Sequence, residues 1–498
     1  MALAMTLLPL LLAALAATLP SNRHRPLILP LAAVLQLGMT LAAIWPALFG
    51  LPEAPESGGS WLGLDAPGKL VLVVVVVLYF FCSIYCVGYL RHRAERANRV
   101  FVSCLLAFLG VASLVCWSKH LGLMWVAIEA TTLSTAPLIY FNRSKRAIEA
   151  TWKYLLVCSV GIALALLGTF FLAYSAVPAG LAPSMDIDEV LRNAGGLSKP
   201  WLRAAFVLLL VGYGTKMGLA PMHSWKPDAY GEAPGVVGAV FAGGVASCAF
   251  LALSRVYRVC VEAGEGLYVS RLLLCMGLFS MAVAGIFMIG QRDFKRMLAY
   301  SSVEHMGILA LGLGIGGPAL YGAMLHVATS GMSKGLLFLS AGNIHRAYES
   351  KSTDEVRGAL RRLPLSASFF LLGFLAITGS PPFGCFVSEL SILGGAFGSG
   401  RGLAAALCLA FLFIGFMGMG KTVLKVVQGR PPVEASPYGA SSVAPLGGSP
   451  GARAYRDGLL TALPLVGLAA LVLLLGLCLP APFEALVRES AAWLGAKP

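Results

Sequence analysis

Several ionisable side chains stand inside long apolar stretches of this sequence. A charge near the centre of a bilayer costs roughly 2.5–3.5 kcal/mol on insertion scales, so such residues usually face the interior of a helix bundle and mark proton relays or ion paths. A purely structural role could be filled by hydrogen-bonded neutral groups, whose burial costs less free energy than the burial of a charge. The chemistry that this set favours is therefore proton transfer. Its members are Glu129, Lys216, Glu304, His305, His326, Lys334 and Glu389.

Two members of the set have opposite charges in separate spans. Glu129 lies in MWVAIEATTLST (124–135), and Lys216 lies in TKMGLAPMHSW. As a pair, each side chain would set the pKa of the other, and a change in their separation would release or capture a proton. A static buried ion pair that fixes the helix register is the structural alternative.

A second group follows one helical period. His326, Ser330 and Lys334 recur every four residues and therefore share one face of a predicted helix. An imidazole, a hydroxyl and an amine in one row could order a chain of water molecules, whereas a polar face that binds a neighbouring helix is the alternative. Glu304 and His305 are adjacent and therefore point in different directions. A lone intramembrane histidine often only forms a hydrogen bond, so both roles stay open for His305.

Proline interrupts two predicted spans, and each of these spans also carries an ionisable residue. Pro221 follows Lys216 in TKMGLAPMHSW. Pro381 and Pro382 precede Glu389 in TGSPPFGCFVSE. Proline breaks a helix, and interrupted helices mark ion or substrate sites in transporters that are built from repeats. Irregular packing alone would explain the prolines, but not their coincidence with charge.

The elements that must position these residues are membrane helices. The chain of 498 residues is 58% hydrophobic and 12% charged, whereas soluble proteins contain about 25% charged residues. Apolar runs near the ~20 residues that span a bilayer predict an all-α polytopic membrane protein with about fourteen transmembrane helices. The predicted spans are 3–20, 27–50, 69–90, 100–117, 121–141, 154–177, 202–223, 234–257, 270–290, 297–316, 318–341, 365–398, 403–425 and 458–480.

The charge distribution predicts the topology. Basic residues form short clusters between apolar runs, as in RHRAERANR (91–99) and RDFKR (292–296). The positive-inside rule places both termini outside. The net charge of +14 does not predict nucleic-acid binding, because no basic domain with interleaved aromatic residues is present. The first segment has no basic residue before its apolar core, so it is predicted to be a transmembrane helix and not a cleaved signal peptide.

No sequence pattern predicts a cofactor or a metal. The 11 cysteines are scattered singly through apolar segments, without CxxC or Cys/His ligand spacing. GLGIGG (312–317) matches GxGxxG, but it ends an apolar helix that no strand precedes, so it is not a dinucleotide site.

Six motifs in order give the chain a family resemblance. It resembles the antiporter-like, proton-translocating membrane subunits of respiratory complex I, Mrp antiporters and membrane-bound [NiFe]-hydrogenases, and most of all hydrogenase-4 component F. The resemblance covers about residues 80–400. It rests on MWVAIEATTLST, WKYLLVCSVG, GYGTKMGLAPMHSWKPDAYGEAP, RDFKRMLAYSSVEHMGILALGLGIGGP, the stripe from His326 to Lys334, and TGSPPFGCFVSEL.

The resemblance implies two inverted five-helix repeats, each with one broken helix. The expected divisions are residues 1–99 with three N-terminal transmembrane helices, 100–257 with the first repeat, 258–426 with the second repeat, 427–457 as a flexible loop, and 458–498 with the last transmembrane helix and a tail.

Roles follow from the resemblance residue by residue. It implies that Glu129 is the acid of the fifth helix and that Lys216 is its partner on the broken seventh. Lys334 matches the central proton-transfer lysine, and Glu389 matches the exit residue on the broken twelfth helix. His305 and His326 match polar relay positions, and Glu304 is a feature of the hydrogenase-like branch.

The sequence departs from the family pattern at three positions. Ser247 stands where many relatives have a bridging lysine or histidine, Ser330 where a second histidine is common, and Tyr230 where PDAH has histidine. A serine hydroxyl does not carry a proton as a charge at neutral pH, although it can bridge water molecules. These changes leave one alternative open: the protein is a scaffold whose proton channel no longer functions.

The expected function is a proton-conducting, non-catalytic subunit of a multi-subunit oxidoreductase in a bacterial or archaeal cell (inner) membrane. The expected partners are other membrane subunits, peripheral [NiFe]-hydrogenase-like or Fe–S subunits, the lipid bilayer and H⁺. One alternative is a secondary Na⁺/H⁺ antiporter. Another is a membrane subunit that energises inorganic-carbon uptake.

Overall fold

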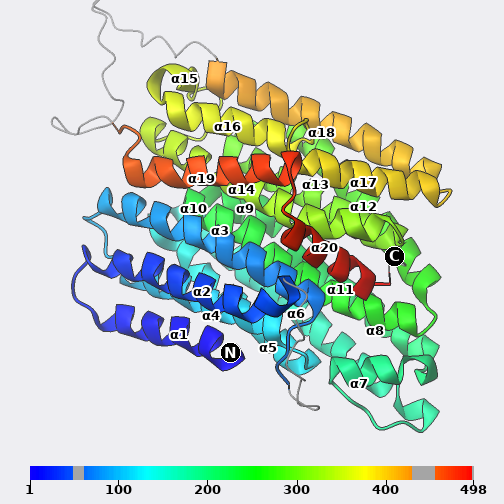
Figure 1. Cartoon of the computed structure of the whole chain (residues 1–498). Helices are drawn as coiled ribbons and strands as arrows, with labels where there is room; N and C mark the ends of the chain where they lie inside the picture. The colour runs from blue at the N-terminus through cyan, green and yellow to red at the C-terminus, as the bar shows by residue number, and fades with distance from the viewer. Residues whose placement is uncertain (49–60, 429–454, 496–498) are drawn as a thin grey trace, which may run out of the picture.

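The computed structural model describes residues 1–48, 61–428 and 455–495, and these residues form a bundle of helices (Figure 1). In these ranges only isolated bridges between loops have β geometry, which confirms the all-α prediction. The first half contains α1 (Ala2–Thr18), α2 (Ile28–Leu48), α3 (Ala66–Arg91), α4 (Arg99–Trp117), α5 (Leu121–Ile139), α6 (Lys145–Tyr174), α7 (Ile187–Arg192), α8 (Lys199–Met217), α9 (Trp225–Glu232), α10 (Gly235–Ala239) and α11 (Ala246–Glu262). The second half contains α12 (Gly266–Ile289), α13 (Phe294–Ile315), α14 (Ala319–Tyr348), α15 (Ala359–Arg362), α16 (Pro364–Ile377), α17 (Gly384–Gly398), α18 (Gly402–Gln428), α19 (Leu459–Leu477) and α20 (Ala481–Trp493).

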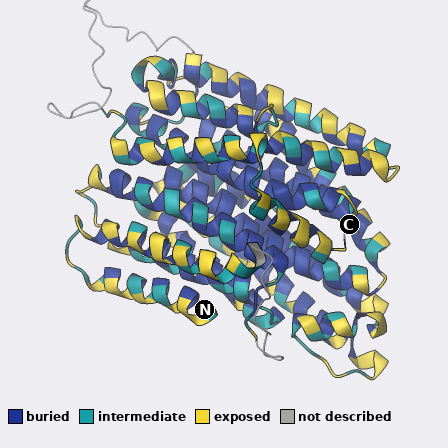
Figure 2. Cartoon of the chain, in the orientation of Figure 1, coloured by how far each residue is buried: buried dark blue, intermediate teal, exposed yellow. Residues whose placement is uncertain are grey.

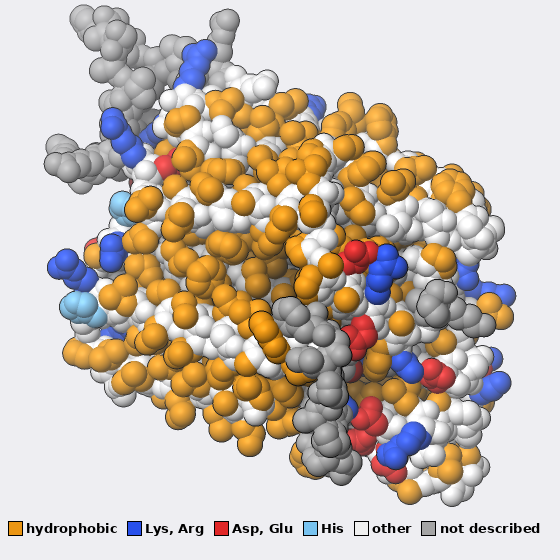
Figure 3. Space-filling model, in the orientation of Figure 1, with side chains coloured by type: hydrophobic (Ala, Val, Ile, Leu, Met, Phe, Trp, Pro, Cys, Tyr) orange, Lys and Arg blue, Asp and Glu red, His pale blue; other side chains and the backbone are white. Residues whose placement is uncertain are grey.

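Among the described residues, 10 helices are long and apolar enough to cross a membrane, and α1, α16 and α17 are shorter apolar helices. Hydrophobic side chains cover the middle of one face of the molecule, while charged side chains lie toward the ends of the helices (Figure 3). Both termini lie at the same end of the bundle (Figure 1). The structure therefore has the form of a polytopic membrane protein, and the count of about fourteen spans stays a prediction.

The longest central helix, α14, is 30 residues long but does not meet the hydropathy criterion for a span. It packs against α3, α10, α13, α16, α17, α19 and α20, and it is buried along most of its length. Helices at the margin such as α18 expose large apolar side chains (Figure 2). A helix that is surrounded by protein need not be apolar all round, and for this reason α14 can carry His326 and Lys334.

Two spans are broken at the predicted prolines. Residues 218–224 separate α8 from α9, and residues 378–383 separate α16 from α17. Gly218 (φ +79°) and Gly379 (φ +66°) adopt the left-handed conformation immediately after the helical turns end, which a residue with a side chain rarely does. Pro221 and Pro382 follow in cis peptide bonds. The two breaks thus share one local geometry, while the division of the chain into two repeats stays a prediction.

The structure adds elements that the sequence analysis did not predict. The tail after α19 forms the amphipathic helix α20, which packs on α2, α3 and α14. The long connection at 178–200 contains the short helix α7. A π-helical turn at Val240–Val245 joins α10 to α11. The predicted flexible loop lies mostly at 429–454, outside the described residues.

Candidate functional site

Glu129 and Lys216 are connected through one hydroxyl group. Lys216 Nζ donates to Thr132 Oγ1 at 2.6 Å, and Thr132 Oγ1 donates to Glu129 Oε2 at 3.1 Å. Ser159 Oγ donates to the other carboxylate oxygen at 3.0 Å. Distances of this size lie within reach of direct proton transfer. The sequence predicted the two charged residues but not the threonine between them.

Tyr154 of α6 completes the surroundings of the Lys216 ammonium group. Lys216 Nζ also donates to the Tyr154 hydroxyl at 2.9 Å and lies 5.0 Å from the centre of its ring. The Tyr154 hydroxyl in turn pairs with Thr135 Oγ1 at 2.8 Å. Lys216 is only 1% exposed, and a buried charge is tolerated only where such partners surround it. We call Glu129, Thr132, Tyr154 and Lys216 the first cluster.

The break after α8 places Lys216 in the last helical turn. The last carbonyl groups of a helix have no partner within it, and two residues of α9 bind them here. Trp225 Nε1 donates to the carbonyl of Thr215 at 2.9 Å, and Lys226 Nζ donates to the carbonyl of Met217 at 2.6 Å. The end of α8 is thus bound by α9.

Lys226 is an ionisable residue that the sequence analysis missed. It is fully buried, its Nζ lies 3.4 Å from the Ser302 carbonyl oxygen of α13, and its ammonium group lies 5.7 Å from the Tyr230 ring centre. The signal was present, because Lys226 directly follows the break in the motif HSWKPDAY. The short polar helix after the break concealed it, since that segment has no apolar run of its own.

The second cluster joins α13, α14 and α17. His305 Nδ1 and His326 Nε2 share a hydrogen bond of 2.9 Å, and His326 Nδ1 pairs with Ser388 Oγ at 2.8 Å. The two rings are stacked with centres 5.1 Å apart. Ser388 was not predicted, because a serine in a helix usually bonds only to its own backbone. His305 therefore does form a hydrogen bond, and its partner is another predicted residue.

Glu389 belongs to the second cluster by position. Its carboxylate oxygen and the nitrogens of His305 and His326 all lie within 4.8 Å of one another. That spacing would also suit a metal ion. We define the second cluster as His305, His326, Ser388 and Glu389.

Three predicted polar atoms are buried without a hydrogen-bond partner in the described part of the chain: Lys334 Nζ, Glu304 Oε1 and Glu389 Oε1. Lys334 is in electrostatic contact with His305 and His326. Glu304 lies against Gly415 of α18, where a side chain would collide with its carboxylate. Glu304 and Glu389 lie close enough to repel each other.

Two predicted serines, Ser247 and Ser330, form no hydrogen bond with a member of either cluster among the described residues. Ser247 Oγ donates to the carbonyl of Gly243, in the π-helical turn that precedes α11, at 2.7 Å. Ser330 is buried on α14 between His326 and Lys334. A role in proton transfer stays a prediction for both residues.

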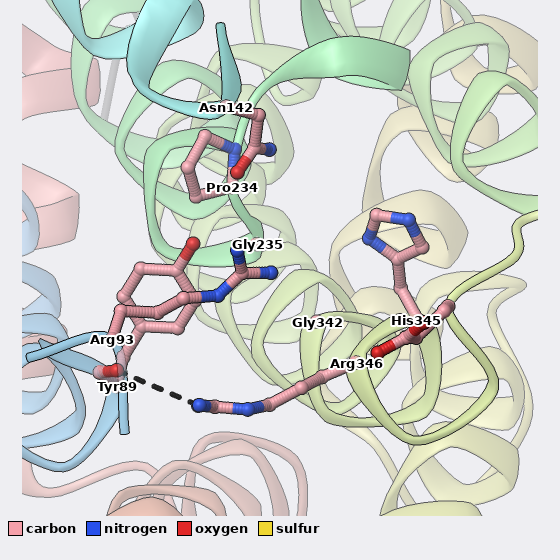
Figure 4. Close-up of a pocket in the computed structure, with 9 residues that line it drawn as sticks. Tyr89, Arg93, Asn142, Pro234, Gly235, Gly342, His345 and Arg346 are labelled. Carbon is pink, nitrogen blue, oxygen red and sulfur yellow. Dashed lines mark hydrogen bonds between the residues drawn. The ribbon is translucent and has the colours of Figure 1, made fainter. Parts of the chain in front are cut away.

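A cavity of about 290 Å³ lies at the end of the bundle where α5 ends and α10 begins. Arg93, His345 and Arg346 line it, and Arg346 reaches toward the Tyr89 carbonyl at 3.5 Å (Figure 4). His345 is 19 residues from His326 on α14, which corresponds to about 28 Å along the helix axis. This cavity is therefore distinct from the second cluster.

Comparison with known proteins identifies the family. Residues 118–417 match the family model "NADH:quinone oxidoreductase/Mrp antiporter, TM". The chain is 35% identical over 396 residues to the "Hydrogenase-4 component F homolog" of Methylacidiphilum infernorum, which covers 75% of this chain and 82% of that protein. It is 31% identical over 376 residues to "NADH-quinone oxidoreductase subunit N" of Desulforudis audaxviator, covering 72% and 74% of the two chains.

A solved structure shares the fold. A chain of the Mrp complex from a Dietzia species superimposes with a TM-score of 0.85 over 99% of this chain and 97% of that chain, at 21% identity. The matched region of the family model contains both clusters and both helix breaks. The chain therefore belongs to the family of NADH:quinone oxidoreductase and Mrp antiporter transmembrane subunits.

Proposed function

We propose that this protein moves protons across a cell membrane as one membrane subunit of a multi-subunit redox complex. The observation that supports the proposal most is the hydrogen-bonded chain from the half-buried Glu129 through Thr132 to the buried Lys216. A merely structural ion pair would place the two charges in direct contact. A hydroxyl between them keeps the charges apart and gives the proton a path.

The second cluster supplies the other half of the proposed route. From Lys216 the proton passes to the region of Lys334, His305 and His326, and it leaves through Glu389. Moving one charge against 100 mV costs about 2.3 kcal/mol, which a change of less than two pKa units at ~1.36 kcal/mol each can supply. A change in the electric field at Glu129 or Lys216 that supplies about 2.3 kcal/mol is therefore sufficient to drive the transfer of one proton.

The partners are proposed from the names of the relatives. Hydrogenase-4 component F and NADH-quinone oxidoreductase subunit N are each named as one component or subunit of an oxidoreductase. We propose that this chain lies beside other membrane subunits and that peripheral [NiFe]-hydrogenase-like or Fe–S subunits carry out the redox chemistry. The membrane is a bacterial or archaeal cell (inner) membrane, with both termini outside.

Na⁺/H⁺ exchange is the second candidate. Two buried carboxylate oxygens, Glu304 Oε1 and Glu389 Oε1, have no partner among the described side chains, and carboxylate oxygen suits a hard cation. A solved structure of the same fold comes from an Mrp complex.

One preparation tests both candidates. The full chain is purified with whatever subunits accompany it, reconstituted into vesicles, and driven by a K⁺ diffusion potential while an internal dye reports pH. We expect proton flux that Glu129→Gln abolishes without loss of assembly. Flux that continues unchanged in Glu129→Gln contradicts the proposed route, and flux that requires a Na⁺ gradient favours exchange.

A further inference from the structure

Lys226 lies between the two clusters and belongs to neither. On one side its Nζ donates to the carbonyl of Met217 at 2.6 Å, and Met217 directly follows Lys216. On the other side the same Nζ lies 3.4 Å from the carbonyl oxygen of Ser302, which precedes His305 by one turn of α13. One amine thus contacts the backbone next to a member of each cluster.

The surroundings of Lys226 suit an amine that alternates between its protonated and its neutral form. Its contacts are carbonyl oxygens and the face of the Tyr230 ring at 5.7 Å, not a carboxylate. Lys334 lies close enough to repel its ammonium group, and Lys226 acts in the same way on His305. No carboxylate among the described residues binds this amine, so no counter-charge fixes it in the protonated form.

The fold keeps space for this side chain. Gly218 has no side chain, and a Cβ atom there would lie 3.1 Å from Lys226 Nζ and closer still to its chain carbons. Two buried hydroxyl groups lie beside Lys226: Ser302 Oγ on α13, and the Tyr230 hydroxyl on α9, the helix that also carries Lys226. Ser247, in contrast, is turned toward the carbonyl of Gly243.

We infer that Lys226 carries the proton from the first cluster to the second. The inference rests on the proposed function and adds the connection between its halves. The Lys216 ammonium gives its proton to the neutral amine of Lys226, which then gives it to an imidazole nitrogen of His305. Lys226 returns to the neutral form after each transfer, so no other reactant is needed.

A purely structural role is the competing explanation, because the ammonium group also binds the end of α8. Arginine separates the two roles, since it keeps the charge and the donors but does not release its proton. Lys295 offers a matched control: it is also a buried lysine that donates to backbone carbonyls, those of Gly231 and Ala233. These bonds lie at the far end of α9, away from both clusters.

The test measures proton flux through the reconstituted protein for Lys226→Gln, Lys226→Arg and Lys295→Gln, with a thermal unfolding curve for each. We expect Lys226→Gln and Lys226→Arg to lower the flux on the order of tenfold or more, while Lys295→Gln stays near the wild-type rate. Wild-type flux in Lys226→Arg, or in Lys226→Gln, would overturn the inference.

A second measurement keeps this inference separate from the proposed function. Lysines labelled with ¹⁵N at Nζ are followed by NMR as pH changes, in the wild type and in Lys334→Met. We expect the Lys226 signal to titrate and its midpoint to move when Lys334 is removed. If the protein conducts no protons, the proposed function fails and the inference fails with it. If Glu129→Gln abolishes a measured flux but the Lys226 signal neither titrates nor responds to Lys334→Met, the inference alone fails and the proposed function stands.

Discussion

Glu129 and Lys216 lie on one hydrogen-bond chain without contacting each other, because the Thr132 hydroxyl accepts from the lysine and donates to the carboxylate. Opposite charges in a medium of low dielectric constant normally attract into direct contact. The threonine prevents this contact while it keeps the donor and the acceptor connected. The pair can therefore exchange a proton without first breaking an ion pair.

Thr132→Val tests that connection. Valine has nearly the same shape but no hydroxyl, so Lys216 retains only Tyr154 as a partner, and Glu129 retains only Ser159. We expect proton flux in vesicles to fall by about tenfold or more, with a loss of unfolding free energy of about 1–3 kcal/mol from the unpaired groups. Thr132→Ser restores the hydroxyl and should conduct. Equal flux in the valine and serine variants would show that the hydroxyl carries no proton.

The second cluster predicts a graded response. His326 contacts both His305 and Ser388, so His326→Leu removes two hydrogen bonds and the central titratable ring, and we expect flux to fall by about a hundredfold. Ser388→Ala removes only the group that orients the ring, and the expected decrease is several-fold, on the order of one hydrogen bond of about 1 kcal/mol. A serine variant that is impaired as strongly as the histidine variant would contradict this order.

A buried ion pair outside the relay predicts an effect on stability alone. Arg255 is completely buried and donates to both carboxylate oxygens of Asp65 at 2.8 and 2.9 Å. Asp65→Asn leaves the guanidinium group without its counter-charge, and we expect a loss of about 3–5 kcal/mol in unfolding free energy. Glu484→Gln, which removes the half-buried partner of the exposed Arg488, should change the unfolding free energy by no more than ~1 kcal/mol. Denaturation in detergent measures both, and proton flux per folded molecule should be unchanged in both.

Close packing of α6 against α8 predicts a strict limit on side-chain size. A Cβ atom at Gly212 would lie 2.6 Å from the Gly161 carbonyl oxygen and from Ala165 Cβ. Gly212→Val should therefore separate the two helices, lengthen the contact between Tyr154 and Lys216, and cost about 1–3 kcal/mol of unfolding free energy.

Gly394 of α17 is the control for this substitution, because nothing lies within 4 Å of a Cβ atom there. Gly394→Val should leave stability and flux nearly unchanged. Equal losses in the two variants would show that flexibility, and not space, determines the effect at Gly212.

The sequence predicted the positions of the helices and of the ionisable residues. Both can be recognised because the free energy of transfer into lipid favours long apolar runs and makes a charge within such a run exceptional. The helix breaks were also predictable, since Pro221, Pro381 and Pro382 cannot continue the hydrogen-bond pattern. Hydropathy also predicted the span 318–341, where α14 lies, although this helix is buried by protein along most of its length. Hydropathy failed for α20, whose amphipathic residues pack along one face only and form no apolar run.

The residues that connect the charges could not be predicted from sequence. Thr132, Tyr154 and Ser388 are ordinary polar residues in helices, and most residues of their types bond to a nearby backbone carbonyl. Their importance arises from contacts between helices that are distant in the sequence, such as Thr132 of α5 with Lys216 of α8. Lys226 was overlooked because its helix follows a break and therefore has the composition of a loop.

The first cluster is not covered by the described part of this chain on the side where Glu129 and Ser159 lie. Glu129 is only half-buried, and Ser159, which donates to its carboxylate, lies exposed on α6. Leu133, Trp152, Leu156 and Val160 project from the same two helices and are exposed as well. A neighbouring subunit that packed against this side would cover both the carboxylate and the serine that binds it. The acid end of the relay would then lie in the interface between the two chains.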